Sequence, residues 1–331
     1  MFRPAGKLEW SLACSNARRW HFLGSINSET RSCETAKALC RLGLMDGNRI
    51  LRIRWPESPF SDEGERMTSE NIEIFKTQCG QPNVMERDLL ASVPDFIADA
   101  KQLNSPSVIL DITSMPKRFY FFYLKSLMRD PSVEDLMVTY CGGRYGQGPL
   151  SSNHEDWDVL PTFRGSDRIA EEEARKRLAV NVGFMPGGLQ EHLRTDDSEL
   201  DLFLILPFPA RVSSVRRVWK SAMEIHNEWH GESSSIHIRR VAPDDISGAF
   251  DLICRIANGN RLSLAPFGPK PISAAMCIFA ALTDAPVYYA QPKWYSPQYT
   301  TEPDTDELGQ PKISGHWIKH RGKLLYDCPS P

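Results

Sequence analysis

The sequence predicts an α/β fold made of two tandem Rossmann-like lobes, each with a mostly parallel sheet. Three observations lead to this prediction. The chain has 331 residues, more than one hydrophobic core usually organises. Strand-like and helix-like patterns alternate along it, as in βαβ units. The alternation stops after residue 141, starts again near residue 200, and contains two similar stretches, so we also expect an internal duplication.

The composition indicates a folded, cytoplasmic protein. It is 41% hydrophobic, 24% charged and 10% aromatic, which is ordinary for a globular chain. The formal net charge of −3 argues against general binding of duplex DNA. The longest apolar runs, Leu202–Leu206 and Ala274–Leu282, are shorter than the roughly 18–20 residues that span a bilayer. Eight cysteines without a CxxC pair fit reduced thiols, and no signal peptide is visible.

Residues 1–165 form the expected N-terminal lobe. Its clearest element is the apolar, β-branched run Ser107–Ile112, which fits a strand buried on both faces. The expected strands are Leu8–Cys14, Arg49–Ile53, Ser107–Ile112 and Leu136–Tyr140, and the expected helices are Ser32–Leu42, Leu89–Leu103 and Phe119–Met128.

Residues 166–199 are interpreted as a connector and 200–331 as the C-terminal lobe. The connector holds a charged stretch, Asp167–Leu178, that predicts a solvated helix, and a glycine-rich stretch, Gly183–Gly188. The C-terminal lobe has expected strands at Leu202–Leu206, Ile236–Val241, Arg261–Ala265 and Pro286–Ala290, helices at Val212–Ile225, Ile246–Ile256 and Ile272–Leu282, and a short hairpin over Trp317–Tyr326.

The two lobes match best at one unit of each. The stretch from Ser107 to Met128 and the stretch from Arg261 to Leu282 are both a strand, a short loop ending in Pro-Lys, and an apolar helix. Their lysines, Lys117 and Lys270, are about half the chain length apart, as a duplication requires. Unrelated α/β units also have this layout, so the alternative is chance similarity.

The segment Asp111–Lys117 (DITSMPK) is the most informative candidate site. Ligands of open α/β sheets bind beyond the carboxyl ends of the strands, and a helix N-terminus there favours phosphate. Thr113 and Ser114 could donate to phosphate or ribose oxygens, and Lys117 supplies a positive charge. Asp111 would repel phosphate, so we expect a structural role for it, either as an N-cap or as a group that orients the loop or Lys117. The alternative is a structural turn with a solvent-facing Lys117.

The spacing D-x-T-x-x-x-K in this segment resembles the D-x-T-G-G-T-K signature of CARF domains, which are CRISPR-associated Rossmann-like sensors of cyclic oligonucleotides. Asp111, Thr113 and Lys117 match its acid, threonine and lysine, whereas residues 114–116 depart from its Gly-Gly-Thr. SAVED domains look like two fused CARF units and resemble the two-lobed layout. In the second half only Lys270 is in register. The resemblance implies a sensor that drives a separate effector protein.

Basic residues follow many of the expected strands and predict a positive cleft between the lobes. Arginine suits such a cleft because its planar fork binds phosphate bidentately. Because lysine and arginine also fill ordinary surface loops, the cleft has a plain alternative. The candidate ligand-binding residues are Ser15, Asn16, Arg18, Arg19, Thr113, Ser114, Lys117, Arg118, Arg144, Arg211, Lys270 and Lys293.

Aromatic side chains lie near the same loops and could stack on nucleobases or simply pack. These are Trp20, Tyr145, Trp294, Tyr295 and Tyr299. No nucleophile elbow, Walker A loop or GxGxxG motif is present. His21, in the ligand-side loop expected after the strand Leu8–Cys14, is the only side chain we can name as a candidate base. The pair His226 and His230 lacks a third ligand, so we expect no metal and no cofactor.

These observations favour a sensor or regulatory subunit that binds a phosphate-bearing nucleotide, for example a cyclic oligonucleotide in prokaryotic antiviral defence. We expect binding rather than catalysis. Two alternatives stay open: a non-catalytic scaffold in a nuclease or ATPase complex, and a nucleotide-processing hydrolase. The sequence leaves the base, the ring size and homo-oligomer formation open.

Overall fold

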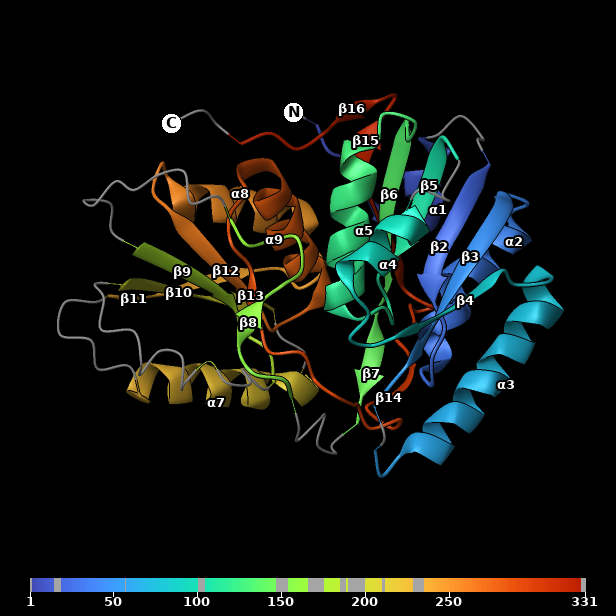
Figure 1. Cartoon of the computed structure of the whole chain (residues 1–331), viewed down its shortest axis with the longest axis horizontal. Coiled ribbons are helices and arrows are strands. Elements are labelled where there is room, and N and C mark those ends of the chain that lie inside the picture. Colours follow the sequence, from blue (N-terminus) through green and yellow to red (C-terminus); the bar gives the residue numbers. More distant parts are fainter. Residues whose placement is uncertain are drawn as a thin grey trace. The chain divides into compact units, whose positions relative to one another are not determined.

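The computed structural model describes residues 2–14, 19–56, 58–100, 105–146, 154–165, 176–184, 189, 200–209, 212–228 and 235–328. The chain forms two compact units (Figure 1). The N-terminal unit comprises Met1–Asn153 together with Pro292–Tyr326, and the C-terminal unit comprises His154–Gln291 together with Asp327–Pro331. Both units are α/β. No helix among the described residues is long and apolar enough to cross a membrane.

A mostly parallel sheet organises the N-terminal unit. Its parallel strands are β2 (Trp20–Ser25), β3 (Met45–Arg54), β4 (Val84–Asp88), β5 (Ser107–Asp111) and β6 (Asp135–Cys141), in the spatial order β4-β3-β2-β5-β6. Three antiparallel strands follow β6: β15 (Ile313–His320) pairs with it, and β1 (Ala5–Lys7) and β16 (Lys323–Leu324) pair with β15. Counted from β2, the parallel order is 3-2-1-4-5, the order of doubly wound Rossmann sheets.

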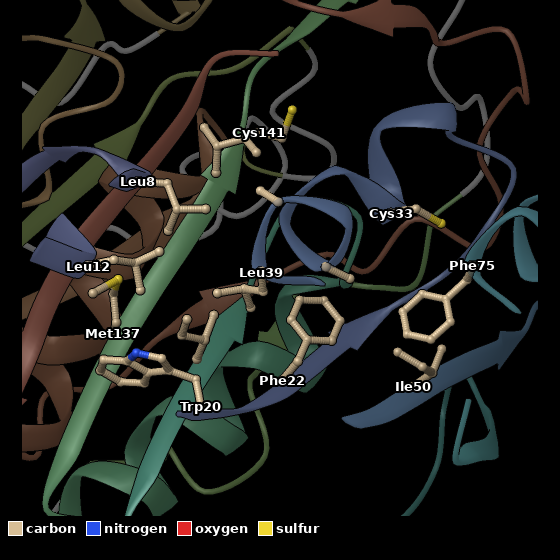
Figure 2. Packing of buried hydrophobic residues seen from close by; sticks show 14 of the residues in the cluster. Leu8, Leu12, Trp20, Phe22, Cys33, Leu39, Ile50, Phe75, Met137 and Cys141 are labelled. Carbon is tan, nitrogen blue, oxygen red and sulfur yellow. The ribbon is translucent and has the colours of Figure 1, made fainter. Parts of the chain in front are cut away.

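Helices cover both faces of this sheet. The helices α1 (Leu8–Ala13), α2 (Glu34–Arg41) and α3 (Ser61–Cys79) supply Leu8, Leu12, Leu39 and Phe75 to one core, against Trp20, Phe22, Ile50 and Met137 of the strands (Figure 2). A 3₁₀ turn, η1 (Thr30–Cys33), leads into α2. Alternate strand residues face the other side, where α4 (Val93–Ala100) and α5 (Lys117–Arg129) pack together through the rings of Phe96, Phe119 and Phe122. A small ribbon of β7 (Gly143–Tyr145) and β14 (Thr300–Pro303) follows β6.

The sheet of the C-terminal unit is parallel throughout. Its strands are β9 (Lys176–Asn181), β10 (Leu200–Pro207), β11 (Ile236–Val241) and β12 (Leu262–Pro266), in the order β11-β10-β9-β12. Counted from β9 this is 3-2-1-4, the same order as in the N-terminal unit. Its helices are α7 (Val212–Glu228), α8 (Ile246–Ala257) and α9 (Lys270–Thr283), and a small ribbon joins β8 (Asp158–Val159) to β13 (Tyr288–Tyr289).

The matched stretches of the sequence also match in local structure. In the N-terminal unit β5 leads to α5 through Pro116, whose backbone has φ −59° and ψ 147°. In the C-terminal unit β12 leads to α9 through Pro269, with φ −52° and ψ 140°. At both prolines ψ is extended rather than helical, so both helices start at the lysine that follows.

The predicted strand Leu8–Cys14 is wrong, because residues 8–13 form helix α1. Leu8, Ser11 and Leu12 are buried, which is the spacing of a helix face rather than of a strand. The first parallel strand of the sheet is instead β2, which lies where we expected a loop. This change moves the carboxyl end of the first strand from residue 14 to Ser25.

The predicted connector is also wrong in part. The last residues of the expected helix Asp167–Leu178 begin β9, the strand between β10 and β12 in the C-terminal sheet. The remainder of that helix, residues 167–175, lies outside the described residues. The predicted C-terminal hairpin does form, as β15 and β16, but it extends the N-terminal sheet rather than closing the C-terminal lobe.

Candidate ligand site at the switch point of the N-terminal sheet

The carboxyl ends of β2 and β5 define the candidate site. These neighbouring strands are the point at which the strand order reverses, since β3 and β4 lie on one side and β6 lies on the other. In sheets of this type the loops that leave such a switch point diverge and leave room for a ligand. Two loops meet here, residues 26–29 after β2 and residues 112–116 after β5.

Asp111, the last residue of β5, organises the second loop. Its side chain is 1% exposed and accepts hydrogen bonds from the hydroxyls of Thr35 (2.5 Å), Thr113 (3.1 Å) and Thr139 (2.9 Å). It also accepts the backbone N–H of Thr113 at 3.0 Å. Burial raises the pKa of Asp111, and the hydrogen bonds from Thr35, Thr113 and Thr139 oppose that rise. Asp111 therefore holds the loop, as the sequence indicated, and Pro116 rather than Asp111 occupies the N-cap of α5.

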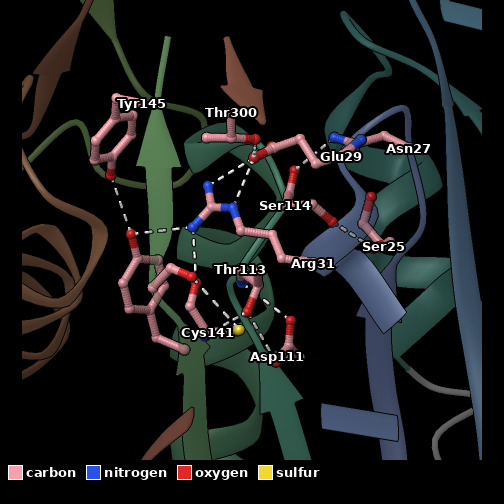
Figure 3. Close-up of polar contacts among 12 residues, drawn as sticks. Ser25, Asn27, Glu29, Arg31, Asp111, Thr113, Ser114, Cys141, Tyr145 and Thr300 are labelled. Carbon is pink, nitrogen blue, oxygen red and sulfur yellow. Dashed lines mark hydrogen bonds and ion pairs between the residues drawn. The ribbon is translucent and has the colours of Figure 1, made fainter. Parts of the chain in front are cut away.

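The hydroxyls of Thr113 and Ser114 are used inside the protein. Thr113 donates to Asp111 and accepts the backbone N–H of Cys141 at 2.8 Å. Ser114 donates to the backbone oxygen of Ser25 (Figure 3). A hydroxyl has one proton, so neither side chain has a hydrogen left for a phosphate in this arrangement. Both residues shape the loop, and the expectation that they donate to a ligand does not fit these contacts.

Ser25, at the carboxyl end of β2, is a polar group that the sequence analysis missed. Its side chain is 1% exposed, and its Oγ makes no hydrogen bond to any described residue. A buried hydroxyl without a partner costs free energy, so its position next to Ser114 at the switch point is informative. Asn27 links the two loops by donating to the backbone oxygen of Ser114 at 3.3 Å.

Lys117 is the first residue of α5, and its side chain is 9% exposed. Side chains in a helix lean toward its N-terminus, which here is the end that meets the loop after β5. Burial lowers the pKa of Lys117 to about 7. An anion bound near this amine would favour its charged form, so Lys117 suits a phosphate group better than a neutral one.

Arg31 and Glu29 form a buried ion pair beside the same loops (Figure 3). Arg31 is 3% exposed and donates from Nε and Nη2 to Glu29 Oε2, at 2.8 and 2.7 Å. Its Nη1 donates to the backbone oxygen of Cys141 at 2.7 Å and to the hydroxyl of Tyr140 at 3.2 Å. Burial is the largest influence and opposes the charge, but the Glu29 carboxylate together with Tyr140 and Tyr145 outweighs it, so the pKa of Arg31 is raised.

The other predicted ligand residues do not gather at this site. Arg19 precedes β2, at the amino end of the sheet, where it is 68% exposed and lies 3.6 Å from Asp46. The guanidinium of Arg118 donates to the backbone oxygen of Ala91. Arg144 pairs with Glu302 on the β7–β14 ribbon. Lys293 is half-buried in the N-terminal unit, Lys270 begins α9 in the C-terminal unit, and Ser15, Asn16, Arg18 and Arg211 lie outside the described residues.

Three of the predicted stacking residues come together. Tyr145 and Tyr299 have ring centroids 5.2 Å apart, and Tyr295 is 6.1 Å from Tyr299. Trp294 packs on Phe60 instead, with centroids 5.4 Å apart. Trp20 is fully buried against Trp317 at the amino end of β2 and cannot meet a ligand at the switch point.

The side chain predicted as a candidate base does not lie at the site. His21 is the second residue of β2, four residues before Ser25 and so about 13 Å along the strand. Its placement in a ligand-side loop was therefore wrong. Burial raises the pKa of Cys33 to about 11 and that of Cys141 to about 12, so both thiols are protonated at neutral pH. Within the described ranges, no three His, Cys, Asp or Glu side chains gather as metal ligands.

Comparisons with known proteins assign neither a family nor a function to this chain. No family model matches the sequence, and no curated protein matches it. One similar solved structure is a functionally unknown protein from Pseudomonas aeruginosa, 13% identical over 84% of this chain and 95% of that chain, with a TM-score of 0.25. Another is a mutant of RipA, 10% identical over 95% of this chain and 83% of that chain, with a TM-score of 0.21.

The buried Lys117 predicts a pH-dependent difference in stability. Its pKa is about 7 in the folded protein and 10.5 in an unfolded chain, so the unfolded state binds more protons between these values and stability rises with pH there. In Lys117→Met this contribution disappears. The wild-type free energy of unfolding, relative to the variant, should rise by about 1.4 kcal/mol per pH unit from pH 7 to 10.

Urea denaturation at several pH values measures this difference. The exposed Lys323 of the same unit provides the control, because Lys323→Met should leave the pH dependence unchanged. Parallel curves for wild type and Lys117→Met would show that the Lys117 amine is not buried in this way.

Proposed function

We propose that the N-terminal unit binds a phosphate-bearing nucleotide at the switch point between β2 and β5. The observation that carries this proposal is the buried hydroxyl of Ser25, which lacks a hydrogen-bond partner among the described residues and lies at the carboxyl end of β2, beside Ser114 of the loop before α5. A phosphate oxygen would accept its proton. The N-terminus of α5 and the amine of Lys117 supply the positive field that favours an anion at the same place.

The two loops favour a ligand that is held rather than converted. Asp111 fixes the loop after β5, and Asn27 ties the loop after β2 to it, so the site is organised before the ligand arrives. A binding role, as in a sensor or regulatory subunit, fits this arrangement best, and the cyclic oligonucleotides of CARF-type sensors are the first ligand class to test.

A duplicated origin of the two units is part of the proposal. The shared order 3-2-1-4 and the matching Pro-Lys starts of α5 and α9 support it. The site itself is not repeated in the residues that carry it, because Ala265 and Pro266 end β12 where β5 ends in Asp111. We therefore place nucleotide binding in the N-terminal unit.

Native mass spectrometry tests the proposal. The full chain is sprayed alone and with a panel of linear and cyclic nucleotides, and we expect a discrete adduct whose mass identifies the ligand class. Lys117→Met should weaken the adduct by roughly tenfold or more and Ser25→Ala by several-fold, since each removes a direct contact to phosphate. Lys323→Met is the charge-matched control. An adduct that survives Lys117→Met and Ser25→Ala unchanged would place the ligand elsewhere.

A further inference from the structure

A segment near the C-terminus contacts residues that follow several strands of the N-terminal sheet, including the loop after β2. This segment, Trp294–Pro303, is called the strap below. Its backbone joins the N-terminal unit through β14, which pairs with β7, and through the N–H of Gly146, which donates to the Tyr299 oxygen at 3.0 Å. Its rings pack on residues that follow the strands: Tyr295 lies 5.2 Å from Trp55, just beyond β3, and Tyr299 lies 5.2 Å from Tyr145.

One side chain ties the strap to the buried ion pair. The hydroxyl of Thr300 donates to Glu29 Oε2 at 2.6 Å (Figure 3). The same oxygen accepts both bonds from Arg31, so one carboxylate oxygen holds three donors. Glu29 in turn is held by its own backbone N–H, which donates to the side chain of Asn27 at 2.9 Å. The strap is thus linked through Glu29 to the loop that contacts Ser114.

Glu29 also occupies the guanidinium of Arg31 in a particular way. Both nitrogens that face it use a single carboxylate oxygen, rather than the two parallel bonds of a bidentate pair. A phosphate group offers several oxygens and can satisfy the fork of Arg31 bidentately. Exchanging one anion for another leaves the buried Arg31 paired throughout, which avoids the large cost of an unpaired buried charge.

We propose that Arg31 is a second anion-binding residue of the ligand site and that the strap is its displaceable cover. An anionic group of the ligand replaces Glu29 on Arg31, Glu29 releases Thr300, and the strap loosens. Ligand binding is thereby converted into a change in the strap, which a partner protein can detect. This inference rests on the proposed function, because the ligand that displaces Glu29 is the one bound at the switch point.

Hydrogen exchange of the ligand-free chain gives the first test. Thr300→Val removes the hydrogen bond to Glu29 and keeps the shape of the side chain. We expect amides 294–303 to exchange roughly tenfold faster, equivalent to about 1.4 kcal/mol, with amides of β2 and β5 unchanged. Thr305→Val is the matched control, because that hydroxyl contacts only the exposed Arg144 among the described residues. Unchanged exchange in Thr300→Val would overturn the proposed latch.

Binding of inorganic pyrophosphate gives the second test. Glu29→Gln keeps the shape but removes the competing charge, so calorimetry should show roughly tenfold tighter binding than in wild type, about 1.4 kcal/mol. Pyrophosphate binding that disappears in Lys117→Met but is unaffected by Glu29→Gln would support the proposed ligand site and would contradict the proposed role of the strap. Absence of pyrophosphate and nucleotide binding in wild type and in every variant would overturn the proposed function first, and the strap with it.

Discussion

Replacing Asp111 by alanine should lower the free energy of unfolding by about 3 kcal/mol or more. The carboxylate is the common acceptor for Thr35, Thr113 and Thr139 and for one backbone N–H. All of these donors are buried, and alanine leaves them without an acceptor. Because Thr113 also holds the N–H of Cys141, the loss extends from the loop to the end of β6.

Urea denaturation of wild type and Asp111→Ala measures this effect. Asp111→Asn retains the shape and one carbonyl oxygen, so it should lose less than half as much stability. Asp88→Asn is the surface control, since Asp88 is paired with Arg54 in an exposed bridge that contributes less than about 1 kcal/mol. A loss in Asp111→Ala as small as that in Asp88→Asn would contradict the role of Asp111 as the organising group.

Arg31→Met should destabilise the protein by about 3–5 kcal/mol, because it leaves the Glu29 carboxylate without its buried counter-charge. The exposed Arg54→Met should cost far less, since that arginine and its partner Asp88 are mostly in water. The loss of stability in Arg31→Met should come from the unpaired Glu29 carboxylate. The double variant Glu29→Gln with Arg31→Met should therefore be more stable than Arg31→Met alone.

The double-mutant comparison separates the ion pair from simple packing. If Arg31 mainly fills space beside Gly143, where a Cβ would approach Arg31 Nε to 2.9 Å, removing Glu29 would not rescue Arg31→Met. Equal or greater loss in the double variant, measured by the same urea titration, would contradict the account of a charge held in place by Glu29.

Much of the fold follows from sequence periodicity, and the exceptions have physical reasons. The buried run that forms β5 and the apolar helices α5 and α9 were predicted within one or two residues at most boundaries. The strand β2 was missed because Trp20, His21 and Gly24 break the alternation that marks a strand. The edge strand β4 alternates only between half-buried and exposed residues, so its apolar signal is weak.

The tail could not be placed from local pattern alone. A hairpin over Trp317–Tyr326 is visible in the sequence, but its partner is decided by the register of β15 against β6, about 175 residues upstream. Periodicity shows which face of a strand is buried, and it does not show which sheet the strand joins. The strap could not be predicted for the same reason, because its contacts with Glu29 and Tyr145 join residues that are far apart in the sequence.

The site was predicted in part. The segment Asp111–Lys117 lies at the switch point, and Asp111 orients its loop as expected. Because we expected the first strand at Leu8–Cys14, we chose Arg19 and its neighbours as candidate ligand residues instead of Ser25, Asn27 and Arg31. The signal that could have found them is the run from His21 to Gly24 followed directly by the polar stretch Ser25–Arg31, which is the pattern of a strand that ends in a ligand loop.

The central claim is that a nucleotide binds at the carboxyl ends of β2 and β5. Hydrogen–deuterium exchange of the full chain, with and without the nucleotide that forms the adduct, tests it most directly. The account predicts slower exchange in amides 25–31 and 112–119, little change in the amino-terminal halves of the same strands, and loss of the effect in Lys117→Met. Protection confined to the C-terminal unit, with these two loops unchanged, would contradict it.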